Sequence, residues 1–432
     1  MNFYSTNNYS HRVSLKEAVL QGLAPDQGLY MPEQIIPLSK SFFDSISNFS
    51  FQDIGFKVAS QLIGGDLPAA ELERIVAHTI QFDAPLVEVD KNIYALELFH
   101  GPTLAFKDFG ARFLSGLLGY FANQQDREIV ILVATSGDTG SAVANGFYNV
   151  PRTKVVVLYP SGKVSDIQEK QFTTLGGNIT ALEVDGTFDD CQRLVKQAFL
   201  DLDLKNKYFL TSANSINIAR LIPQSFYYFN AYAQIPDREM PLVFSVPSGN
   251  FGNLTAGILA KKMGLPIQKF IAATNLNKVV PEFFESKIFE PKSSISTISN
   301  AMDVGNPSNF FRMYDLYGND FEALAKDVTS CYFRDDETKS AMLNVYNSCG
   351  YVMDPHGGIG FLGLKKHLKK NETGIFLETA HPAKFKDVVE ESIHDEIRLP
   401  ARLEEFMSGV KKSIKISAQF GDFKSLLPAL IA

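Results

Sequence analysis

The sequence predicts an α/β protein with two doubly wound lobes, mostly parallel sheets, a ligand cleft between the lobes and a helical N-terminal extension. Three observations predict this class. From Ile93 onward, short β-rich runs alternate with segments long enough for crossover helices. The runs are almost continuously apolar, as in strands that are covered on both faces. Polar, glycine-containing segments follow several of the runs, at the position where open α/β sheets bind ligands.

Helical patterns dominate the first part of the chain. Ser14 and Glu17 have the spacing of a capping box before an amphipathic stretch, which the turn residues 24–28 end. Two further helical patterns cover about 50–63 and 67–80. We therefore expect an N-terminal helical cap region over residues 1–88, a smaller α/β lobe over 89–220, and a larger α/β lobe with a C-terminal extension over 221–432.

The apolar runs that we expect to be strands are short and regularly spaced. They cover residues 94–99, 129–134, 154–159, 179–184, 208–211, 242–246, 268–273 and 374–377. Segments such as 108–123 and 189–200 are long enough to be crossover helices, and the right-handed crossover rule then leaves few topologies. Residues 285–310 are rich in Ser, Asn and Pro and predict a long loop. The tail from about 400 predicts a helix and a short strand.

Composition argues against several classes of function. The 432 residues carry 41 Lys and Arg against 48 Asp and Glu, and the net charge of −7 argues against broad binding to nucleic acids or acidic membranes. Cys191, Cys331 and Cys349 lack paired spacing, which argues against disulfides and a zinc site. No secretion signal is recognised, and the longest apolar runs are far shorter than the roughly 20 residues that span a membrane. We therefore expect a cytoplasmic protein.

An isolated lysine stands in the polar segment 100–109. Lys107 follows a predicted strand, opens a predicted helix and has the apolar neighbours Leu104 and Phe106. Apolar surroundings disfavour an ammonium ion, so Lys107 is a candidate amine nucleophile or proton carrier. The alternative is a lysine at a helix start that extends to water.

Two strand-to-helix turns have the composition of anion-binding sites. Residues 135–142 (TSGDTGSA) offer hydroxyls and backbone N–H groups to a carboxylate or phosphate. Residues 247–253 (PSGNFGN) combine two glycines with a helix start, which permits a phosphate to approach closely. Each turn alone also fits an ordinary capped helix. Together with the isolated lysine, they indicate a phosphorylated cofactor and a second anionic ligand.

Two further polar segments follow predicted strands. Asn214 and Ser215 start a helix, and Arg220 lies on its next turn, so the three residues could hold a phosphate. The alternative is a capped helix with a surface arginine. Thr379 offers a neutral hydroxyl, whereas His381 precedes a proline and is expected to be structural.

Two other patterns are expected to carry no chemistry. Residues 358–363 match G-x-G-x-x-G, and Glu378 stands 20 residues after the first glycine, but these glycines do not directly follow a strand. This disfavours a nicotinamide-dependent dehydrogenase. Cys349, His356 and His381 lack the paired spacing of metal ligands, so we expect no metal.

Taken together, the segments resemble one enzyme family. PTLAFKD around Lys107, TSGDTGSA at 135–142, NSINIARLIPQ at 214–224 and PSGNFGN at 247–253 occur in this order, with SLKEAVLQGLAPDQGLYMP before them and ETAHPAKF after them. This set resembles the threonine synthase family, pyridoxal-phosphate enzymes of fold type II (tryptophan synthase β-like). The resemblance extends from about residue 3 to beyond 385.

The resemblance implies a role for each candidate residue. The lysine that matches Lys107 is bonded covalently to pyridoxal 5′-phosphate and acts as the catalytic base. The resemblance further assigns cofactor binding to Gly249, Asn250, Phe251, Gly252, Asn253, Thr379 and Asp138, and substrate binding to Thr135, Ser136, Gly137, Thr139, Asn214, Ser215 and Arg220. Thr379 is expected to face the pyridine nitrogen. Asp138 stands where many fold type II enzymes have Asn.

The implied reaction converts O-phospho-L-homoserine and water to L-threonine and phosphate, the last step of threonine biosynthesis, in a monomer or homodimer. The same residues would also serve a lyase that releases 2-oxobutyrate from this substrate, which is the nearest alternative. A second alternative is a non-catalytic protein that binds phosphorylated amino acids. The intact PTLAFKD segment disfavours that alternative.

Overall fold

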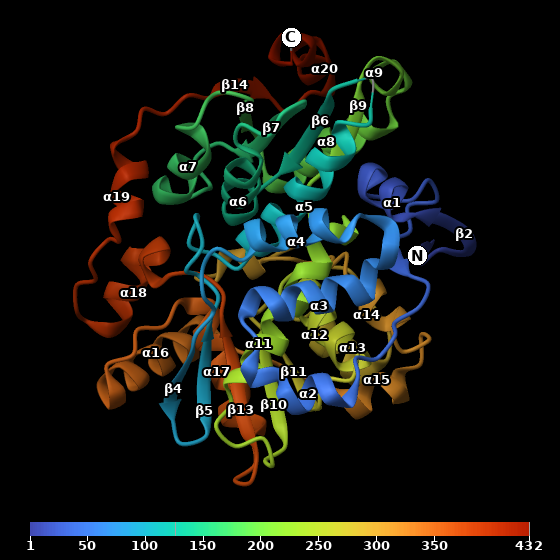
Figure 1. Cartoon of the computed structure of the whole chain (residues 1–432). Coiled ribbons are helices and arrows are strands. Elements are labelled where there is room, and N and C mark those ends of the chain that lie inside the picture. The colour runs from blue at the N-terminus through green and yellow to red at the C-terminus, as the bar shows by residue number, and fades with distance from the viewer. Residues whose placement is uncertain (126, 432) are drawn as a thin grey trace. The chain divides into compact units, whose positions relative to one another are not determined.

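The computed structural model describes residues 1–125 and 127–431, and these form two compact units (Figure 1). Unit 1 contains Met1–Met31, Lys107–Arg220 and Leu399–Ala432, and unit 2 contains Pro32–Phe106 and Leu221–Arg398. Each unit has its own sheet of five or more strands. The lobe boundaries expected at residues 88 and 220 remain a prediction.

Unit 1 is built on a five-stranded parallel sheet with the order β14-β8-β7-β6-β9. These strands are β6 (Ile129–Ala134), β7 (Thr153–Pro160), β8 (Ile179–Asp185), β9 (Phe209–Ser212) and β14 (Ile414–Ser417). The helices are α1 (Leu15–Gln21), α5 (Lys107–Ala122), α6 (Asp138–Phe147), α7 (Asp166–Thr173), α8 (Phe188–Leu200), α9 (Leu202–Lys207), α10 (Ile218–Leu221), α19 (Ala401–Ser408) and α20 (Phe420–Leu430). Helix α8 packs on β6 and β7, whereas α5, α6 and α7 pack side by side.

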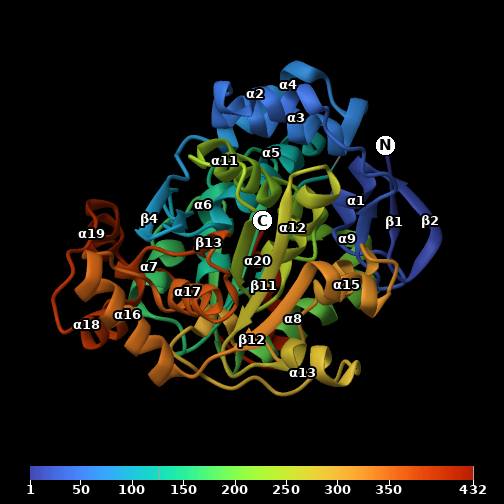
Figure 2. The ribbon, with the colours of Figure 1, turned by 90° about the horizontal axis from the view of Figure 1, so that it is seen from below.

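Unit 2 is built on a six-stranded sheet with the order β12-β11-β10-β13-β5-β4, in which only the β4–β5 pair is antiparallel. Its strands are β4 (Leu86–Asp90), β5 (Ile93–Glu97), β10 (Leu242–Pro247), β11 (Ile267–Thr274), β12 (Val328–Tyr332) and β13 (Thr373–Glu378). Its α-helices are α2 (Lys40–Ser45), α3 (Phe51–Ile63), α4 (Ala69–Thr79), α11 (Phe226–Gln234), α12 (Gly252–Lys262), α13 (Val279–Ser286), α14 (Phe310–Asp315), α15 (Phe321–Asp327), α16 (Asp335–Cys349), α17 (Pro355–His367) and α18 (Lys386–Ile393). Short 3₁₀ turns are η1 (Ile46–Asn48), η2 (Gly64–Asp66), η3 (Ile222–Ser225), η4 (Asn300–Met302) and η5 (Pro382–Phe385). Helix α17 packs along β10, β11 and β13, and Figure 2 shows α17 close to β13.

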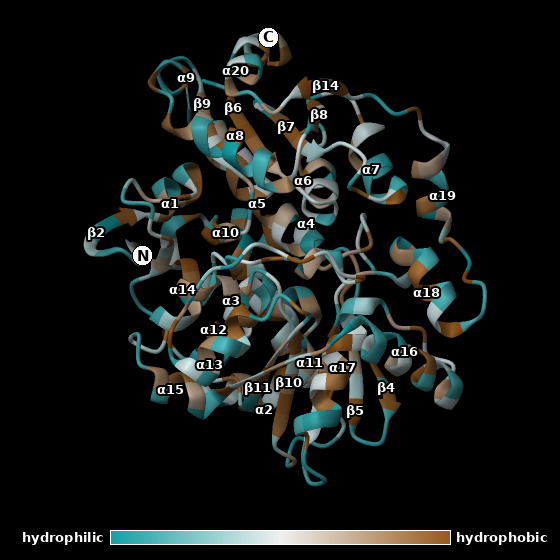
Figure 3. Cartoon of the chain, turned by 180° about the vertical axis from the view of Figure 1, so that it is seen from behind, coloured by the Kyte–Doolittle hydropathy of each residue, from teal (hydrophilic) through white to brown (hydrophobic). Residues whose placement is uncertain are grey.

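The strands that the sequence predicts are confirmed because their pattern has a direct physical cause. Every residue of β6 and β10 is buried, so neither strand has a solvent face that would require polar alternation. Figure 3 shows hydrophobic colouring along β6, whereas the helix α8, which has an exposed face, is mixed in colour. The capping box of Ser14 and Glu17 is also present, and α3 and α4 occupy the two expected helical stretches.

The first residues differ from the helical expectation. Residues Asn2–Ser5 (β1) and Asn8–Ser14 (β2) form an antiparallel pair, and Tyr30–Pro32 (β3) completes a three-stranded sheet in the order β2-β1-β3. Phe3 lies opposite Val13, and both side chains are buried. The exposed polar residues between them hide this two-residue alternation in the sequence. The strands β4 and β12 and the last helix, α20, were also not expected.

The G-x-G-x-x-G segment lies inside a helix and not in a turn after a strand. This placement is consistent with the expectation that it is not a dinucleotide-binding turn. Gly358, Gly360 and Gly363 all belong to α17, which begins at Pro355 with Asp354 as its N-cap. A Cβ atom on Gly363 would come within 2.4 Å of the Ser245 hydroxyl on β10. These glycines therefore allow the helix to pack closely on the sheet.

A buried carboxylate, paired with lysines, fastens the C-terminal segment of unit 1 to its sheet. Glu183 on β8 receives Lys411 at 2.8 Å, Lys415 at 3.6 Å and the Ser161 hydroxyl at 2.6 Å. Burial alone would raise the pKa of Glu183, but its bonds to Lys411 and Ser161 outweigh burial and lower the pKa to about 2. Lys411 also contacts Glu169 on α7 at 2.7 Å. The segment after α19 therefore contacts both β8 and α7.

We predict that Lys411→Met destabilises the protein by about 1–2 kcal/mol at pH 7, which is less than for a fully buried pair because Lys411 is about one-third exposed. Glu183 contributes stability above its unfolded pKa of 4.5, and this contribution is lost as the pH falls towards 2. The difference in the free energy of unfolding between the variant and the parent should therefore shrink below pH 4.5. Denaturant unfolding at several pH values measures it.

Lys415→Met is the matched control, because Lys415 is 78% exposed and lies farther from the same carboxylate. It should change the free energy of unfolding by less than about 0.5 kcal/mol. Equal effects of the two substitutions, or a Lys411→Met difference that stays constant from pH 7 to pH 2, would contradict the assignment.

Candidate active site

The carboxyl ends of the parallel strands in unit 2 carry three of the polar segments. Strands β10, β13 and β5 are neighbours with parallel registers, so their ends lie at one edge of the sheet. The residues that follow them are the turn 248–253, the segment 379–385 and the segment 98–106. Parallel strands thus bring together the turn predicted to hold a phosphate and Thr379.

The backbone around Thr379 holds the segment that leads to Lys107. The Phe106 N–H donates to the Thr379 carbonyl at 2.9 Å, and the His381 N–H donates to the Leu104 carbonyl at 3.0 Å. Leu104 has a φ of 58°, a left-handed conformation that is uncommon for a branched residue. Phe106 directly precedes Lys107 in the chain. The segment that precedes Lys107 in the chain is thereby tied to the strand end that carries Thr379.

In unit 1, the loop 135–139 follows β6 and is closed by its own hydroxyl. Thr135 Oγ1 accepts the N–H groups of Gly137 at 2.9 Å and Gly140 at 2.8 Å. Gly137 has a φ of 142°, a conformation that L side chains rarely adopt. Ser136 and Thr139 are partly exposed, whereas Thr135 is buried. The hydroxyls of Ser136 and Thr139 are therefore more accessible to a ligand than that of Thr135.

Lys107 and Asp138 begin neighbouring helices and face each other. The distance from Lys107 Nζ to Asp138 Oδ2 is 3.6 Å, and the side chains are 16% and 3% exposed. A carboxylate at this distance favours the ammonium form of a lysine, which opposes the effect of apolar neighbours. The side chain expected to be isolated among apolar groups therefore has an acidic partner, from the loop predicted to bind substrate.

The second polar turn of unit 1 lies beside the first. Asn214 Nδ2 donates to the carbonyl of Ala134, the last residue of β6, at 2.9 Å, and the backbone N–H of Asn214 donates to the Ser212 hydroxyl at 3.2 Å. Strand β9 pairs with β6, which explains why the turns after them are neighbours. Ser215 is partly exposed.

Arg220 is buried, which excludes the alternative of a surface arginine. Only 3% of the residue is exposed, and Nη1 donates to the Ala213 carbonyl at 2.5 Å. Burial lowers the pKa of Arg220 to about 10, against the opposing charge of Asp108. A Cβ atom on Gly110 of α5 would meet the Arg220 Nε at 2.7 Å. A glycine at that position on α5 is thus what gives the guanidinium its space.

The turn after β10 is shaped by close backbone contacts. A Cβ atom on Gly249 would lie 2.6 Å from the Cα atom of Met302, so the glycine is required by η4. Phe251 has a φ of 60° and is the N-cap residue of α12, which begins at Gly252. The Asn250 Oδ1 accepts the Ser308 N–H at 2.6 Å. The loop 285–310 therefore packs against this turn from one side.

That loop is irregular, as predicted, but a partly buried carboxylate anchors it. Asp303 accepts hydrogen bonds from Asn275 Nδ2 at 2.9 Å, Asn277 Nδ2 at 3.1 Å and the Thr297 hydroxyl at 2.8 Å. Burial raises the pKa of Asp303 to about 6, although these donors act in the opposite direction. The sequence offered no indication of this network, because its residues are spread over three short segments.

Asn253 presents an oriented amide at the first turn of α12. Its Oδ1 accepts the hydroxyls of both Tyr227 and Tyr228 at 2.8 Å, and burial raises the pKa of both tyrosines well above 10, so they remain donors. The Asn253 Nδ2 must then point away from them. Among the residues that the structure describes, this Nδ2 has no hydrogen-bond partner. A buried donor at a helix N-terminus is suited to an anion.

Thr379 follows a buried acidic pair that sequence reasoning missed. Glu378 is fully buried, and burial together with Asp354 raises its pKa well above 4.5. Asp354 accepts the Ala380 N–H at 3.2 Å and the His356 ring nitrogen at 2.5 Å. The pair therefore fixes the backbone that directly follows Thr379. Nothing in the residue types alone distinguishes it from an ordinary strand end.

The histidines have local structural partners, as expected. His381 Nδ1 accepts the Ala383 N–H at 3.1 Å and caps η5, and burial lowers the pKa of His381 to about 4. Within the described ranges 1–125 and 127–431, no cluster of three or more His, Cys, Asp or Glu could hold a metal. Cys191, Cys331 and Cys349 are free, and burial raises the pKa of the first two thiols to about 12.

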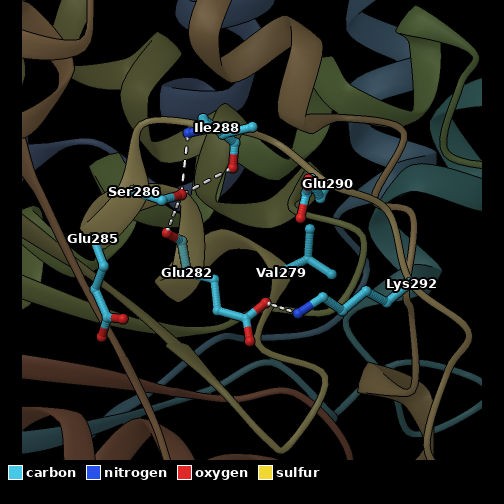
Figure 4. Close-up of a pocket in the computed structure, with 7 residues that line it drawn as sticks. All are labelled: Val279, Glu282, Glu285, Ser286, Ile288, Glu290 and Lys292. Carbon is cyan, nitrogen blue, oxygen red and sulfur yellow. Dashed lines mark hydrogen bonds and ion pairs between the residues drawn. The ribbon is translucent and has the colours of Figure 1, made fainter.

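A separate open hollow of about 330 Å³ lies at the start of the loop 285–310 (Figure 4). Its lining consists of Val279, Glu282, Glu285, Ser286, Ile288, Glu290 and Lys292. Lys292 contacts Glu282 at 2.5 Å. None of the predicted site residues lines it, and three glutamates do not suit an anionic ligand. The hollow is therefore not part of the candidate active site.

Known proteins match the chain from end to end. Three family models match in order: "Threonine synthase N terminus" over residues 2–80, "Pyridoxal-phosphate dependent enzyme" over 78–377 and "Threonine synthase, C-terminal" over 359–426. The threonine synthase of Haemophilus influenzae is 48% identical over 405 residues, with 94% of both chains covered.

The chain belongs to the threonine synthase family.

Solved structures of this family agree in fold. The threonine synthase of Escherichia coli superimposes with a TM-score of 0.93 at 43% identity, with 99% of this chain and 100% of that chain covered. The pyridoxal-phosphate-bound threonine synthase of Brucella melitensis gives a TM-score of 0.93 at 34% identity, with 100% and 99% covered. As a member of the threonine synthase family, the chain is a pyridoxal-phosphate-dependent lyase of fold type II. In the described parts of the chain, no helix is both long and apolar enough to cross a membrane.

The residues of the glycine turn fit the phosphate group of this cofactor. Asn253 contributes a buried donor that the described residues leave unused, and α12 contributes its N-terminus. Gly252 leaves space beside them, since a Cβ atom there would find its nearest neighbour, the Asn309 amide, at 3.4 Å. A side chain at Gly252 would therefore fit the fold but fill the space in front of the helix start.

We predict that two alanine substitutions in this turn differ in their effect on the free energy of unfolding. Gly249→Ala forces a backbone clash with Met302 and should lower the free energy of unfolding by about 1–3 kcal/mol. Gly252→Ala should change it by less than about 0.5 kcal/mol. Denaturant unfolding of the cofactor-free chain measures both, and equal losses of stability would show that the two glycines are not distinguished as described.

Proposed function

We propose that the chain uses pyridoxal phosphate to convert O-phospho-L-homoserine and water to L-threonine and phosphate. The observation that carries this proposal is the pairing of Lys107 with the acidic residue of the loop 135–139, in a chain that matches threonine synthases over its whole length. When bound, the cofactor supplies an electron sink that makes the substrate Cα–H acidic. The remaining tasks are binding, orientation and proton transfer, for which we propose residues below.

The cofactor phosphate would be held by Gly249, Asn250, Phe251, Gly252 and Asn253. In support, the turn combines the N-terminus of an 11-residue helix with the oriented amide of Asn253. Both features carry positive partial charge, which suits an anionic group. Thr379 would present its hydroxyl to the pyridine nitrogen as a neutral partner. Its backbone is immobilised by Phe106 and by the Asp354 contact to Ala380.

The substrate would be held at both of its charged ends. We assign its carboxylate to Thr135, Ser136, Gly137 and Thr139, and its phosphate to Asn214, Ser215 and Arg220. The hydrogen bond from Asn214 to Ala134 supports this pairing, because it fixes the two turns side by side. Two fixed ends hold a flexible four-carbon chain in one orientation, which accounts for a large part of many enzymatic accelerations.

Lys107 would carry protons between substrate carbons. Its Nζ would take the proton from Cα and exchange a proton at Cβ, before phosphate leaves Cγ and water adds at Cβ. A lysine can do this only if its amine readily takes up a proton and readily releases it again. Asp138, 3.6 Å from Nζ, would stabilise the nitrogen while it holds the proton.

We also propose that the protein acts in the cytoplasm as a monomer or homodimer. Free thiols such as those of Cys191 and Cys331 persist in that compartment.

We predict that the purified protein forms threonine as its dominant product from O-phospho-L-homoserine. The same residues would serve the formation of threonine and the formation of 2-oxobutyrate, so the products themselves must be measured. Amino-acid analysis and a 2-oxobutyrate assay on the same reaction do this. Phosphate release would be the same in either case. Dominant 2-oxobutyrate would overturn the synthase assignment, and Lys107→Ala should abolish both products and the visible absorbance of the bound cofactor.

We further predict that Gly252→Ala weakens cofactor binding by at least about tenfold, because the added methyl group occupies the space in front of the α12 N-terminus. Equilibrium titration of the cofactor-free protein with pyridoxal phosphate measures the affinity. Gly421→Ala in α20 is the control, since a Cβ atom there meets nothing within 4 Å. Unchanged affinity in Gly252→Ala would place the phosphate elsewhere.

A further inference from the structure

A glutamine on α7 contacts the carboxylate that faces Lys107. Gln168 is 1% exposed, and its Nε2 donates to Asp138 Oδ1 at 2.9 Å. The other oxygen of the same carboxylate, Oδ2, lies 3.6 Å from Lys107 Nζ. The carboxylate therefore stands between an amide donor on one side and the lysine on the other. Sequence analysis did not single out this glutamine.

The orientation of the Gln168 amide is fixed by a hydroxyl. Ser165 is the N-cap of α7, and its hydroxyl donates to Gln168 Oε1 at 3.1 Å. Because the amide oxygen is engaged, the NH₂ group is the part that faces Asp138. An N–H donor stabilises an ionised carboxylate more than a protonated one. The contact therefore favours the charged form of Asp138 and fixes the direction of its oxygens.

Gln168 also packs directly on the loop that carries Asp138. A Cβ atom on Gly137 would come within 2.5 Å of the side-chain carboxamide of Gln168. The Ser141 hydroxyl donates to the backbone carbonyl of Gln168 at 3.2 Å. Helix α7 is held in turn by the C-terminal segment, since Lys170 Nζ donates to the Gly409 carbonyl at 2.5 Å. The amide is thus positioned by a rigid surrounding rather than by a flexible side chain alone.

Other charged groups near this pair have partners of their own. On α5, Asp108 interacts electrostatically with Arg112 and Arg220. On α7, Glu169 contacts Lys411 at 2.7 Å, and Lys170 turns to Gly409. Gln168 is therefore the α7 side chain that meets the carboxylate. It is an uncharged donor, which orients Asp138 without competing for the lysine.

We propose that Gln168 is a positioning residue that acts on Lys107 through Asp138, and this rests on the proposed role of Lys107 as proton carrier. By holding the carboxylate ionised and aimed at Nζ, Gln168 keeps a proton on the lysine nitrogen between its removal from one substrate carbon and its delivery to the next. Loss of the amide donor should then slow turnover more than it weakens substrate binding.

A double-mutant cycle tests this inference. The variants are Gln168→Met, which keeps the length of the side chain but removes the donor, Asp138→Asn, and the two together. In the holoenzyme, Asp138→Asn should lower the pH midpoint of the visible absorbance by about one unit or more, and Gln168→Met by a smaller amount. In the Asp138→Asn background, Gln168→Met should add almost no shift. The kcat of the single variant Gln168→Met should fall severalfold with little change in KM.

The controls separate positioning from general damage. Gln192 is exposed on α8, so Gln192→Met should leave the midpoint, kcat and KM unchanged. Gln168→Glu provides a second substitution of nearly equal shape, in case Gln168→Met folds poorly, and should also disturb the midpoint by placing a second carboxylate next to Asp138. An equal shift from Gln168→Met in both backgrounds, or no shift in either, would overturn the inference.

A cofactor-free measurement makes failure of this inference distinguishable from failure of the proposed function. Lys107 of the full chain is labelled with an amine-reactive ester over a range of pH, and mass spectrometry quantifies the labelled peptide. Asp138→Asn and Gln168→Met should shift its labelling curve to lower pH, again without adding to each other. If the parent protein binds no pyridoxal phosphate, the proposed function fails, yet this labelling cycle still decides whether Gln168 acts on Lys107.

Discussion

Buried amides with occupied oxygens govern the geometry around the candidate site residues of each unit. The Ser165 hydroxyl engages Gln168 Oε1, and the Tyr227 and Tyr228 hydroxyls engage Asn253 Oδ1. A carboxamide with its oxygen engaged can direct only its NH₂ group elsewhere. One NH₂ group faces a carboxylate, and the other stands at a helix start. The positions of the donors are therefore decided before any ligand arrives.

Backbone conformation supplies a second constraint. Leu104 and Phe251 are both apolar, both buried and both in a left-handed conformation, and each lies in a segment to which we assign chemistry. Such conformations cost of order 1–3 kcal/mol and persist only where the surroundings enforce them. Around Leu104, the carbonyl accepts the His381 N–H, and around Phe251, the turn is fixed by its close contact with η4. The strain thus marks the places where the fold gives up stability to hold a particular shape.

The sequence predicted the framework because the framework depends on patterns that are local. Strand β6 is a continuous apolar run since both of its faces are covered, and the capping box at Ser14 is readable from two residues. The hairpin of β1 and β2 escaped prediction because exposed polar residues mask its alternation. The expectation that His356 and His381 are structural agrees with their contacts to Asp354 and Ala383.

The site was only partly readable for the opposite reason. Lys107 and the glycine turns stand out because their residue types are unusual for their positions, and a family resemblance gave them roles. Gln168 gives no such signal, since a glutamine on a polar helix is ordinary, and its importance depends on a residue 30 positions earlier. Tyr227 and Tyr228 look like core aromatics until their hydroxyls are followed to Asn253. Contacts between distant positions carry this information, and one sequence does not display them.

The same reasoning gives the C-terminal segment a place in the site rather than at its margin. Residues 409–412 are bonded to α7 through Lys170 and Thr173, and Lys411 joins Glu169 on α7 to Glu183 on β8. Helix α7 carries Gln168, which orients the carboxylate that faces Lys107. The C-terminal segment therefore contacts the helix whose glutamine donates to the carboxylate that faces Lys107. Residues 399–426, which lie within the match to the "Threonine synthase, C-terminal" model, thus have a physical link to the residues around Lys107.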